Sequence, residues 1–292
     1  MQVADVNGDE KLDVVVFENK INGQFRIGLS VLIGNGDGTF GPESFYAGVN
    51  ENSGPGYVVD IDGKNGPDLV RINYNDQRLE TRLNDGTGHF GETLFSGVYA
   101  FGNNGLDPMA KFYLSPITAY FGDFDGDGIN DASVSSAANG LLFLKGTGTG
   151  TFGDGTAAGN RFNVAAYVNY GTNTFPATYH GDGTPFDFNA DGKLDVLYGD
   201  SQNGYLTIGT GRGDGTFALH SYNVQFADDI GIGARGNQPT YRLNVADYNR
   251  DGVLDVAIGS QLDGSRPGSL AIILGDQVGT LRAVSTVPFG ER

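Results

Sequence analysis

A nine-residue acidic pattern that returns about every 60 residues constrains the fold of this chain more than any other feature. Aspartate or asparagine stands at positions 1, 3, 5 and 9 of four copies, which begin at Asp5, Asp123, Asp187 and Asp247. An altered copy begins at Asp60 and carries Lys64 at position 5. A chain with this period is predicted to consist of repeated supersecondary units that bury their apolar faces against one another.

A glycine-rich turn follows each acidic copy as a second landmark. It reads Gly-x-Gly-x-Phe in four repeats and is weakened in the fifth, at residues 36–40, 86–90, 148–152, 213–217 and 277–281. Around the fourth landmark, residues 195–199, 205–209 and 216–220 are predicted to be strands, and residues 184–187 a strand before the acidic loop. Asn-Gly and Asp-Gly pairs supply the positive φ angles that hairpin turns need. Each repeat is therefore predicted to be a four-stranded antiparallel meander.

Meanders of this size are typical of propeller blades, so the fold class predicted here is an all-β β-propeller. Five blades account for one domain over residues 1–292, with repeats at approximately 1–50, 51–113, 114–178, 179–239 and 240–292. Residues 2–5 would form the first inner strand and residues 280–286 the last outer strand. The alternative is a segment of a larger ring, for example one of seven blades.

Charge and composition exclude several classes of protein. The formal net charge is −17, from 18 basic and 35 acidic residues, which argues against a nucleic-acid partner because phosphate binding needs clustered Lys and Arg. The chain has no cysteine, so disulfides and thiolate metal sites are absent. No stretch approaches the roughly 20 apolar residues of a membrane span. The first residues lack the features of a secretory signal, which is either absent or already removed.

The spacing of the acidic residues suits a calcium ion. Oxygens at positions 1, 3, 5 and 9 surround one point, and Ca²⁺ takes 6–8 oxygen ligands at 2.3–2.6 Å. Position 7 would contribute its backbone carbonyl, so its side chain is free to vary. An EF-hand is excluded because position 12 holds no glutamate. Four Ca²⁺ sites are predicted, at Asp5, Asn7, Asp9, Lys11 and Asp13; at Asp123, Asp125, Asp127, Ile129 and Asp131; at Asp187, Asn189, Asp191, Lys193 and Asp195; and at Asp247, Asn249, Asp251, Val253 and Asp255.

The altered copy has a different expectation. Lys64 replaces the aspartate at position 5, and its ammonium group would stand in for the cation by pairing with Asp60, Asp62 or Asp68. Glu10 is a second departure, because it occupies position 6 of the first copy where three others have glycine. That substitution is expected to strain the first loop.

The loop Asp-x-Asn/Asp-x-Asp-Gly-x-x-Asp, followed by Gly-Asp-Gly-Thr-Phe, resembles the FG-GAP/VCBS repeats of integrin-α-type β-propellers. The resemblance covers nearly all of the chain and implies that the acidic side chains at positions 1, 3, 5 and 9 of the four regular copies are calcium ligands. Members of the family include integrin ligand-binding heads, propeller lectins, adhesion modules and parts of polysaccharide lyases. The motifs therefore specify fold and calcium more closely than function.

The function predicted from these features is a calcium-stabilised, non-catalytic, lectin-like or adhesive binding module for carbohydrate or a cell-surface protein. Modules with millimolar calcium affinity work outside the cytoplasm, so a secreted, periplasmic or surface location is expected. Self-association is a further expectation. One alternative is a polysaccharide lyase that uses Tyr179, His180 and Arg161, and another is a structural segment of a larger secreted protein or toxin. Ligand-facing aromatic residues are expected within residues 91–120 and 153–186.

Overall fold

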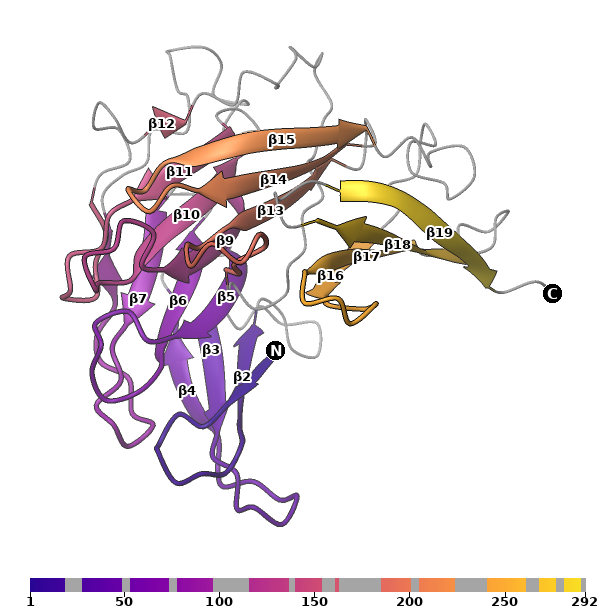
Figure 1. Ribbon diagram of the computed structural model, residues 1–292. Helices are drawn as coiled ribbons and strands as arrows, with labels where there is room; N and C mark the ends of the chain where they lie inside the picture. The colour runs from indigo at the N-terminus through magenta and orange to yellow at the C-terminus, as the bar shows by residue number, and fades with distance from the viewer. Residues whose placement is uncertain are drawn as a thin grey trace, which may run out of the picture. The chain divides into compact units, whose positions relative to one another are not determined.

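The computed structural model describes residues 1–18, 28–48, 53–73, 78–96, 116–136, 140–153, 161–162, 185–200, 205–223, 241–260, 268–276 and 281–289. Over these residues the chain forms small antiparallel sheets of three or four strands and no helix (Figure 1). The all-β prediction is confirmed. The chain divides into two compact units, Met1–Arg161 and Phe162–Arg292.

The first unit contains three sheets whose strands follow one another in chain order. The first sheet comprises β1 (Gln2–Ala4), β2 (Asp13–Glu18), β3 (Gly28–Leu32) and β4 (Ser44–Ala47). The second comprises β5 (Ser53–Val59), β6 (Asp68–Asn73), β7 (Arg78–Arg82) and β8 (Leu94–Phe95). The third comprises β9 (Pro116–Gly122), β10 (Asp131–Ser136), β11 (Gly140–Leu144) and β12 (Arg161–Phe162). Each sheet is a meander, as the spacing of the turns predicts.

The second unit contains a three-stranded and a four-stranded meander. The fourth sheet comprises β13 (Val196–Asp200), β14 (Tyr205–Gly211) and β15 (Phe217–Asn223), and the fifth comprises β16 (Tyr241–Ala246), β17 (Asp255–Ser260), β18 (Gly268–Gly275) and β19 (Leu281–Phe289). The strand predicted before the fourth acidic loop is reduced to one bridge between Phe186 and Asp195. Closure of the sheets into a ring, and the number of blades, stay predictions.

The glycine-rich landmark forms the same turn in four repeats. It brings its phenylalanine opposite a residue two positions beyond the third strand in three repeats, and opposite the last residue of β14 in the fourth; the pairs are Gly34–Phe40, Asn84–Phe90, Gly146–Phe152 and Gly211–Phe217. In the first of these turns the Asp37 carboxylate accepts a hydrogen bond from the Thr39 N–H at 2.9 Å. Such side-chain acceptors replace the ladder bonds that the turn residues lack.

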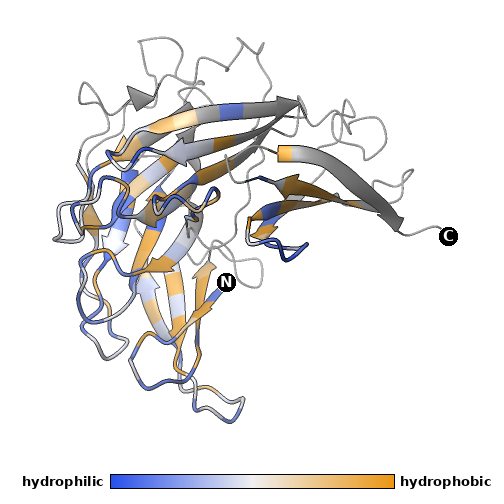
Figure 2. Cartoon of the chain, viewed as in Figure 1, coloured by the Kyte–Doolittle hydropathy of each residue, from blue (hydrophilic) through white to orange (hydrophobic). Residues whose placement is uncertain are grey.

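Neighbouring sheets pack face to face within each unit. Val15 and Val31 of the first sheet form one cluster with Leu69 and Phe90 of the second repeat. Separate clusters join the second sheet to the third and the fourth sheet to the fifth. Hydrophobic residues gather in the strands and hydrophilic residues in the connecting loops (Figure 2). Because each sheet buries apolar side chains against the next, stacking of repeats supplies the core.

Candidate metal centres in the acidic loops

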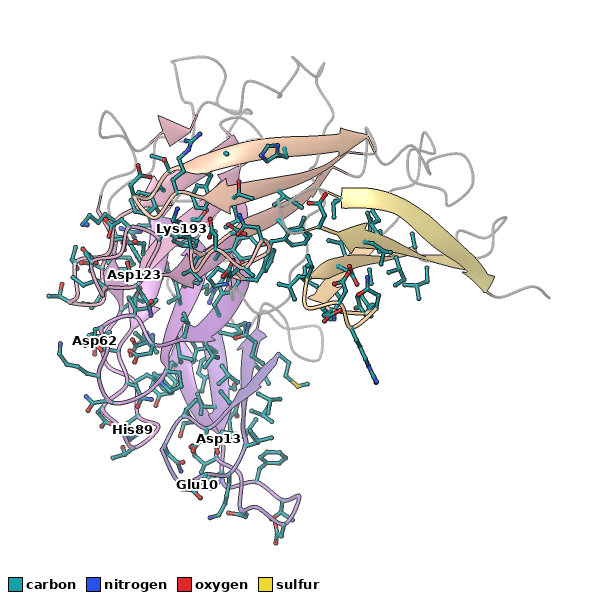
Figure 3. The ribbon with its side chains drawn as sticks, in the orientation of Figure 1. Glu10, Asp13, Asp62, His89, Asp123 and Lys193 are labelled. Carbon is teal, nitrogen blue, oxygen red and sulfur yellow. The ribbon has the colours of Figure 1, made fainter. Side chains whose placement is uncertain are left out.

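Each acidic loop lies between the first and second strands of its meander. The loops connect β1 to β2, β5 to β6, β9 to β10 and β16 to β17, while the loop of the fourth repeat leads from the Phe186 bridge to β13. Figure 3 shows Glu10, Asp62, Asp123 and Lys193 in four of these loops. The repeat therefore places five acidic loops at equivalent points of five sheets.

The aspartate at position 1 holds its own loop in shape. The Asp123 carboxylate accepts hydrogen bonds from the N–H groups of Gly126 at 2.7 Å, Asp127 at 3.1 Å and Gly128 at 2.8 Å. The other regular copies repeat this arrangement, with backbone N–H groups of positions 5 and 6 donating to Asp5, Asp187 and Asp247. A carboxylate that accepts several backbone hydrogen bonds fixes the turn around itself.

Positions 3 and 5 form successive side-chain turns. The side-chain oxygen of position 3 accepts the N–H of position 5 in three loops, at Asn7, Asn189 and Asn249. The Oδ1 atom of position 5 accepts the N–H of position 7 in all four regular copies, at Asp9, Asp127, Asp191 and Asp251. Asn and Asp favour this local bonding, which mimics a backbone turn. The loops are therefore shaped by their own side chains.

Two positions in every loop adopt the left-handed backbone conformation. At position 6 the expected strain is present, because Glu10 has φ 65° where the three other regular copies have glycine; Asn65 of the altered copy has φ 60°. Position 4 is also left-handed in all five loops, although Ala190 (φ 58°) and Arg250 (φ 64°) stand there in two of them. The sequence did not predict a left-handed residue at position 4, because two of the copies have residues other than glycine there.

The aspartate at position 9 is a buried tie between strands. Asp131 is fully buried, and its carboxylate accepts the Phe124 N–H at 3.0 Å and the Gly146 N–H at 2.7 Å. The four equivalent residues bond to the same two points of their repeats, at Asp13, Asp68, Asp195 and Asp255. Position 9 therefore connects the acidic loop to the end of the third strand, a structural role that the pattern alone does not reveal.

Burial raises the pKa of three of these ninth-position carboxyls to about 6, namely those of Asp68, Asp131 and Asp195. Loss of hydration is the largest cause, and the other aspartates of each loop act in the same direction. The two backbone N–H donors act in the opposite direction because they favour the charged form. A cation in the loop would remove this penalty by neutralising the carboxylate.

Carboxylate oxygens converge in two of the loops. One oxygen each from Asp123, Asp125 and Asp131 lies within 4.8 Å of the other two. Oxygens that share a Ca²⁺ at 2.3–2.6 Å are at most about 5 Å apart, so this spacing can hold a metal ion. The Oδ1 atom of Asp125 is buried and has no hydrogen-bond partner within the part of the chain that the structure describes. An oxygen in that state favours a cation beside it.

The altered copy brings together the second set, from Asp60, Asp62 and Asp68, with the same 4.8 Å limit. Lys64 does pair with one of the expected partners, because its Nζ lies 3.5 Å from Asp62 Oδ2. The Lys64 side chain is nevertheless 62% exposed, so it lies largely outside the loop. Whether its ammonium replaces a cation stays a prediction. The three carboxylates of the altered loop therefore converge as those of the third loop do, although Lys64 replaces the aspartate at position 5.

Several predicted site residues remain untested. The backbone carbonyls assigned to Lys11, Ile129, Lys193 and Val253, and the ligand sets of the first, fourth and fifth loops, stay predictions. Tyr179 and His180 of the lyase alternative lie outside the described residues, as do most aromatics of the expected ligand face. Phe95 is described and is 41% exposed, and the Arg78 guanidinium lies 3.7 Å from its ring centre. That pair is a cation–π contact on the surface.

These sheets and loops define a class of all-β repeat proteins with acidic, metal-compatible turns. Residues 187–258, which contain the fourth and fifth acidic loops, match the family described as an FG-GAP-like repeat. The resemblance predicted from the motifs is therefore confirmed for this segment. None of the curated proteins compared with the chain matches it.

Two solved structures resemble the chain in part. The crystal structure of the V. cholerae biofilm matrix protein Bap1 has a TM-score of 0.39 and 16% sequence identity, covering 97% of this chain and 38% of that protein. A member of the DUF4221 family from Bacteroides vulgatus has a TM-score of 0.38 and 11% identity, covering 93% of this chain and 80% of that protein. This chain thus spans well under half the length of the first of these proteins. In the described residues, no helix has the length and apolarity needed to cross a membrane.

Proposed function

We propose that the protein is an extracellular, non-catalytic binding module whose acidic loops hold calcium ions and whose ligand is a carbohydrate or a cell-surface protein. The observation that carries the proposal is the convergence of carboxylate oxygens in the loop that begins at Asp123. The FG-GAP-like match at residues 187–258 supports it, because the same loop pattern stands there. Neither nucleic acid nor membrane insertion is part of the proposal.

The donor chemistry favours calcium over transition metals. Every side chain that these loops offer is a carboxylate or an amide, with no imidazole or thiolate among them. Hard oxygen ligands select Mg²⁺ or Ca²⁺, and a flexible set without the strict octahedral geometry of Mg²⁺ favours Ca²⁺. Calcium reaches millimolar levels outside cells, which is the basis for the proposed location.

The proposed architecture is a β-propeller of five blades over residues 1–292. Within each unit, one sheet buries its apolar face against the next, as the blades of a propeller do. In the first unit, hydrogen bonds also join successive repeats. Asn84 Nδ2 donates to the Val6 carbonyl at 2.7 Å, and the Ala119 N–H donates to the Tyr57 hydroxyl at 2.9 Å. Ring closure by these five sheets is the arrangement we propose.

Removal of calcium tests the structural part of this proposal. With calcium at ten times its Kd, each occupied site stabilises the folded state by about 1.4 kcal/mol, so four sites contribute roughly 6 kcal/mol. We therefore expect the melting temperature of the full chain to fall by many degrees when EDTA replaces millimolar calcium. Magnesium at the same concentration is the control and should restore little of the loss. An unchanged melt would argue against structural calcium.

A glycan array tests the recognition part separately. Binding of the full chain to particular glycans in calcium, without formation of cleaved product, is the expected outcome. A rise in ultraviolet absorbance with uronic-acid polymers would instead favour the lyase. If neither is seen while calcium still stabilises the fold, a protein ligand on a cell surface becomes the candidate.

A further inference from the structure

Lys145 reaches into the third acidic loop from another part of the repeat. It directly follows β11, and its Nζ contacts Asp125 Oδ2 and lies 2.7 Å from Asp127 Oδ2. These two carboxylates occupy positions 3 and 5 of the loop that begins at Asp123. One ammonium group therefore bridges two of the side chains to which calcium binding is assigned.

No other repeat has this lysine. The equivalent residue directly precedes the one paired with the landmark phenylalanine, and it is Ile33, Leu83, Thr210 or Leu274 elsewhere. The third loop is also the regular copy with a carboxylate at position 3, because Asp125 stands where the other three have asparagine. The additional carboxylate of Asp125 thus occurs in the loop where one lysine contacts two carboxylates, whereas Lys11 and Lys193 of the first and fourth loops each lie near a single one. That pairing suggests that the two residues act on each other.

The position of the ammonium group resembles that of a bound cation only in part. Asp125 Oδ2 contacts Lys145, whereas Asp125 Oδ1 is buried and lacks a hydrogen-bond partner among the described residues. Lysine carries a compact charge with three donors on a flexible chain. Its side chain is 49% exposed, so it can leave the loop without disturbing the core. The lysine neutralises the outer side of the loop and leaves an inner oxygen uncompensated.

We propose that Lys145 is a tethered competitor for the cation of the third loop: it contacts Asp125 and Asp127 in the metal-free protein and withdraws when Ca²⁺ binds. This inference rests on the calcium binding proposed above. A divalent ion that binds among Asp123, Asp125 and Asp131 repels a nearby ammonium group and draws on the same carboxylates. The third loop therefore binds calcium more weakly than its four carboxylates would otherwise allow. Loops that bind with different affinity would fill in sequence as calcium rises.

Chemical reactivity of the lysine tests the withdrawal directly in the unmodified full chain. Acetylation by an amine-reactive reagent, measured by mass spectrometry of peptides, should be several-fold faster at Lys145 in calcium than in EDTA. Lys111 is the control, because it lies outside all five acidic loops in the sequence. Its reactivity should change much less. Equal reactivity of Lys145 in both conditions would overturn the inference.

The variant Lys145→Met tests the competition. The amide resonances of Gly126 and Gly128 report calcium in this loop specifically, since both N–H groups bond to Asp123. We expect about threefold to tenfold tighter binding in Lys145→Met, from the loss of two exposed charge pairs. Lys145→Arg should bind as weakly as the unmodified chain. With Asp125→Asn already present, Lys145→Met should have a smaller effect.

The outcomes separate this inference from the proposal beneath it. Calcium uptake with unchanged binding in Lys145→Met means that the lysine has no influence on the site, and weaker binding means that it supports the site. Either result overturns the competition and leaves the proposed function intact. A chain that takes up no calcium in any loop, with or without Lys145, overturns both.

Discussion

The first sheet differs from the second and third in what covers the landmark phenylalanine. Phe40 is 45% exposed, whereas the equivalent Phe90 and Phe152 are 7% and 3% exposed. The residues two places before the first aspartate follow the same trend, since Val3 is 51% exposed and Phe121 only 3%. All three turns have the same backbone pairing. The difference therefore lies in the neighbour and not in the turn.

The contacts of Phe90 explain the difference. Its ring packs edge-on against Tyr46 of the first sheet, 5.7 Å between ring centres, and its N–H donates to the Tyr46 hydroxyl. Phe152 is buried in the cluster shared by the second and third sheets, and its N–H donates to Ser96 Oγ of the second repeat. The landmark phenylalanine thus serves the contact between repeats.

Truncation of the phenylalanine gives the largest expected difference between these sheets. Phe152→Ala should reduce the free energy of unfolding by about 3–5 kcal/mol, as for other buried aromatics, whereas Phe40→Ala should cost about 1 kcal/mol or less where no other sheet covers this face of the first sheet. Urea denaturation of both variants in calcium measures this. Equal losses would indicate that another sheet covers Phe40 in solution, as closure of the proposed ring requires, or that a second copy of the chain does.

The second glycine of the landmark offers a matched test with a smaller effect. Gly38 and Gly150 have nearly the same backbone angle, φ 87° and 85°. A Cβ at Gly38 meets nothing within 4 Å, whereas one at Gly150 would lie 2.5 Å from Leu83 Cδ2 of the second repeat. Both Gly→Ala changes carry the left-handed penalty of about 1–2 kcal/mol, and Gly150→Ala should add about 1–3 kcal/mol for the clash. Thermal unfolding of the pair isolates the contact.

The sequence predicts those parts of the molecule that are local. The five acidic loops, the glycine turns and the meanders follow from turn residues and alternation within a few positions. The one strand that is largely missing, before the fourth loop, is reduced to the Phe186–Asp195 bridge. The fold class was accessible for the same reason, since a period of about 60 residues fixes the size of the repeated unit.

The missed features depend on residues that are distant in sequence. Asp131 reads as a metal ligand, yet it also ties the loop to Gly146 at the end of the third strand. Lys145 lies 20 positions from Asp125, so no nearby motif signals their contact. The role of Phe152 depends on a neighbouring repeat. Such contacts cannot be predicted from local sequence patterns, because they form only when the sheets pack against one another.

The pH dependence of the free energy of unfolding tests the buried carboxyl groups at position 9 of the loops. The pKa values of Asp68 and Asp131 are about 6 in the folded protein and 3.8 in the reference state, so the folded state holds these protons more tightly. In EDTA their contribution to stability is fully present below about pH 4 and is lost as the pH rises through about 6. The pKa values of exposed aspartates such as Asp127 are lowered from 3.8, so these residues change the stability only below about pH 4, outside this window.

Calcium should reverse that trend because it binds the carboxylate form. We expect the stabilisation by calcium to grow between pH 5 and pH 7, measured as the difference in melting temperature with calcium and with EDTA. Asp131→Asn is the control and should flatten the slope in EDTA even though it also removes one acceptor. A slope that is unchanged in this variant would assign the pH dependence to the overall charge of the chain.

The smallest effect concerns the loop backbone, which is alike in all repeats. Glu10 and Arg250 adopt φ 65° and 64° at positions where other loops have glycine. Glu10→Gly and Arg250→Gly should each stabilise the protein by about 0.5–1 kcal/mol, because relief of the left-handed strain exceeds the added freedom of the unfolded chain. Glu10→Ala removes the same carboxylate without relieving φ and should show no gain. Equal gains in the two glycine variants would show that the acidic loops of the first and fifth repeats are alike in stability. The repeats would then differ only in how their apolar faces are packed. A gain in Arg250→Gly alone would instead mean that the first acidic loop responds differently from the fifth.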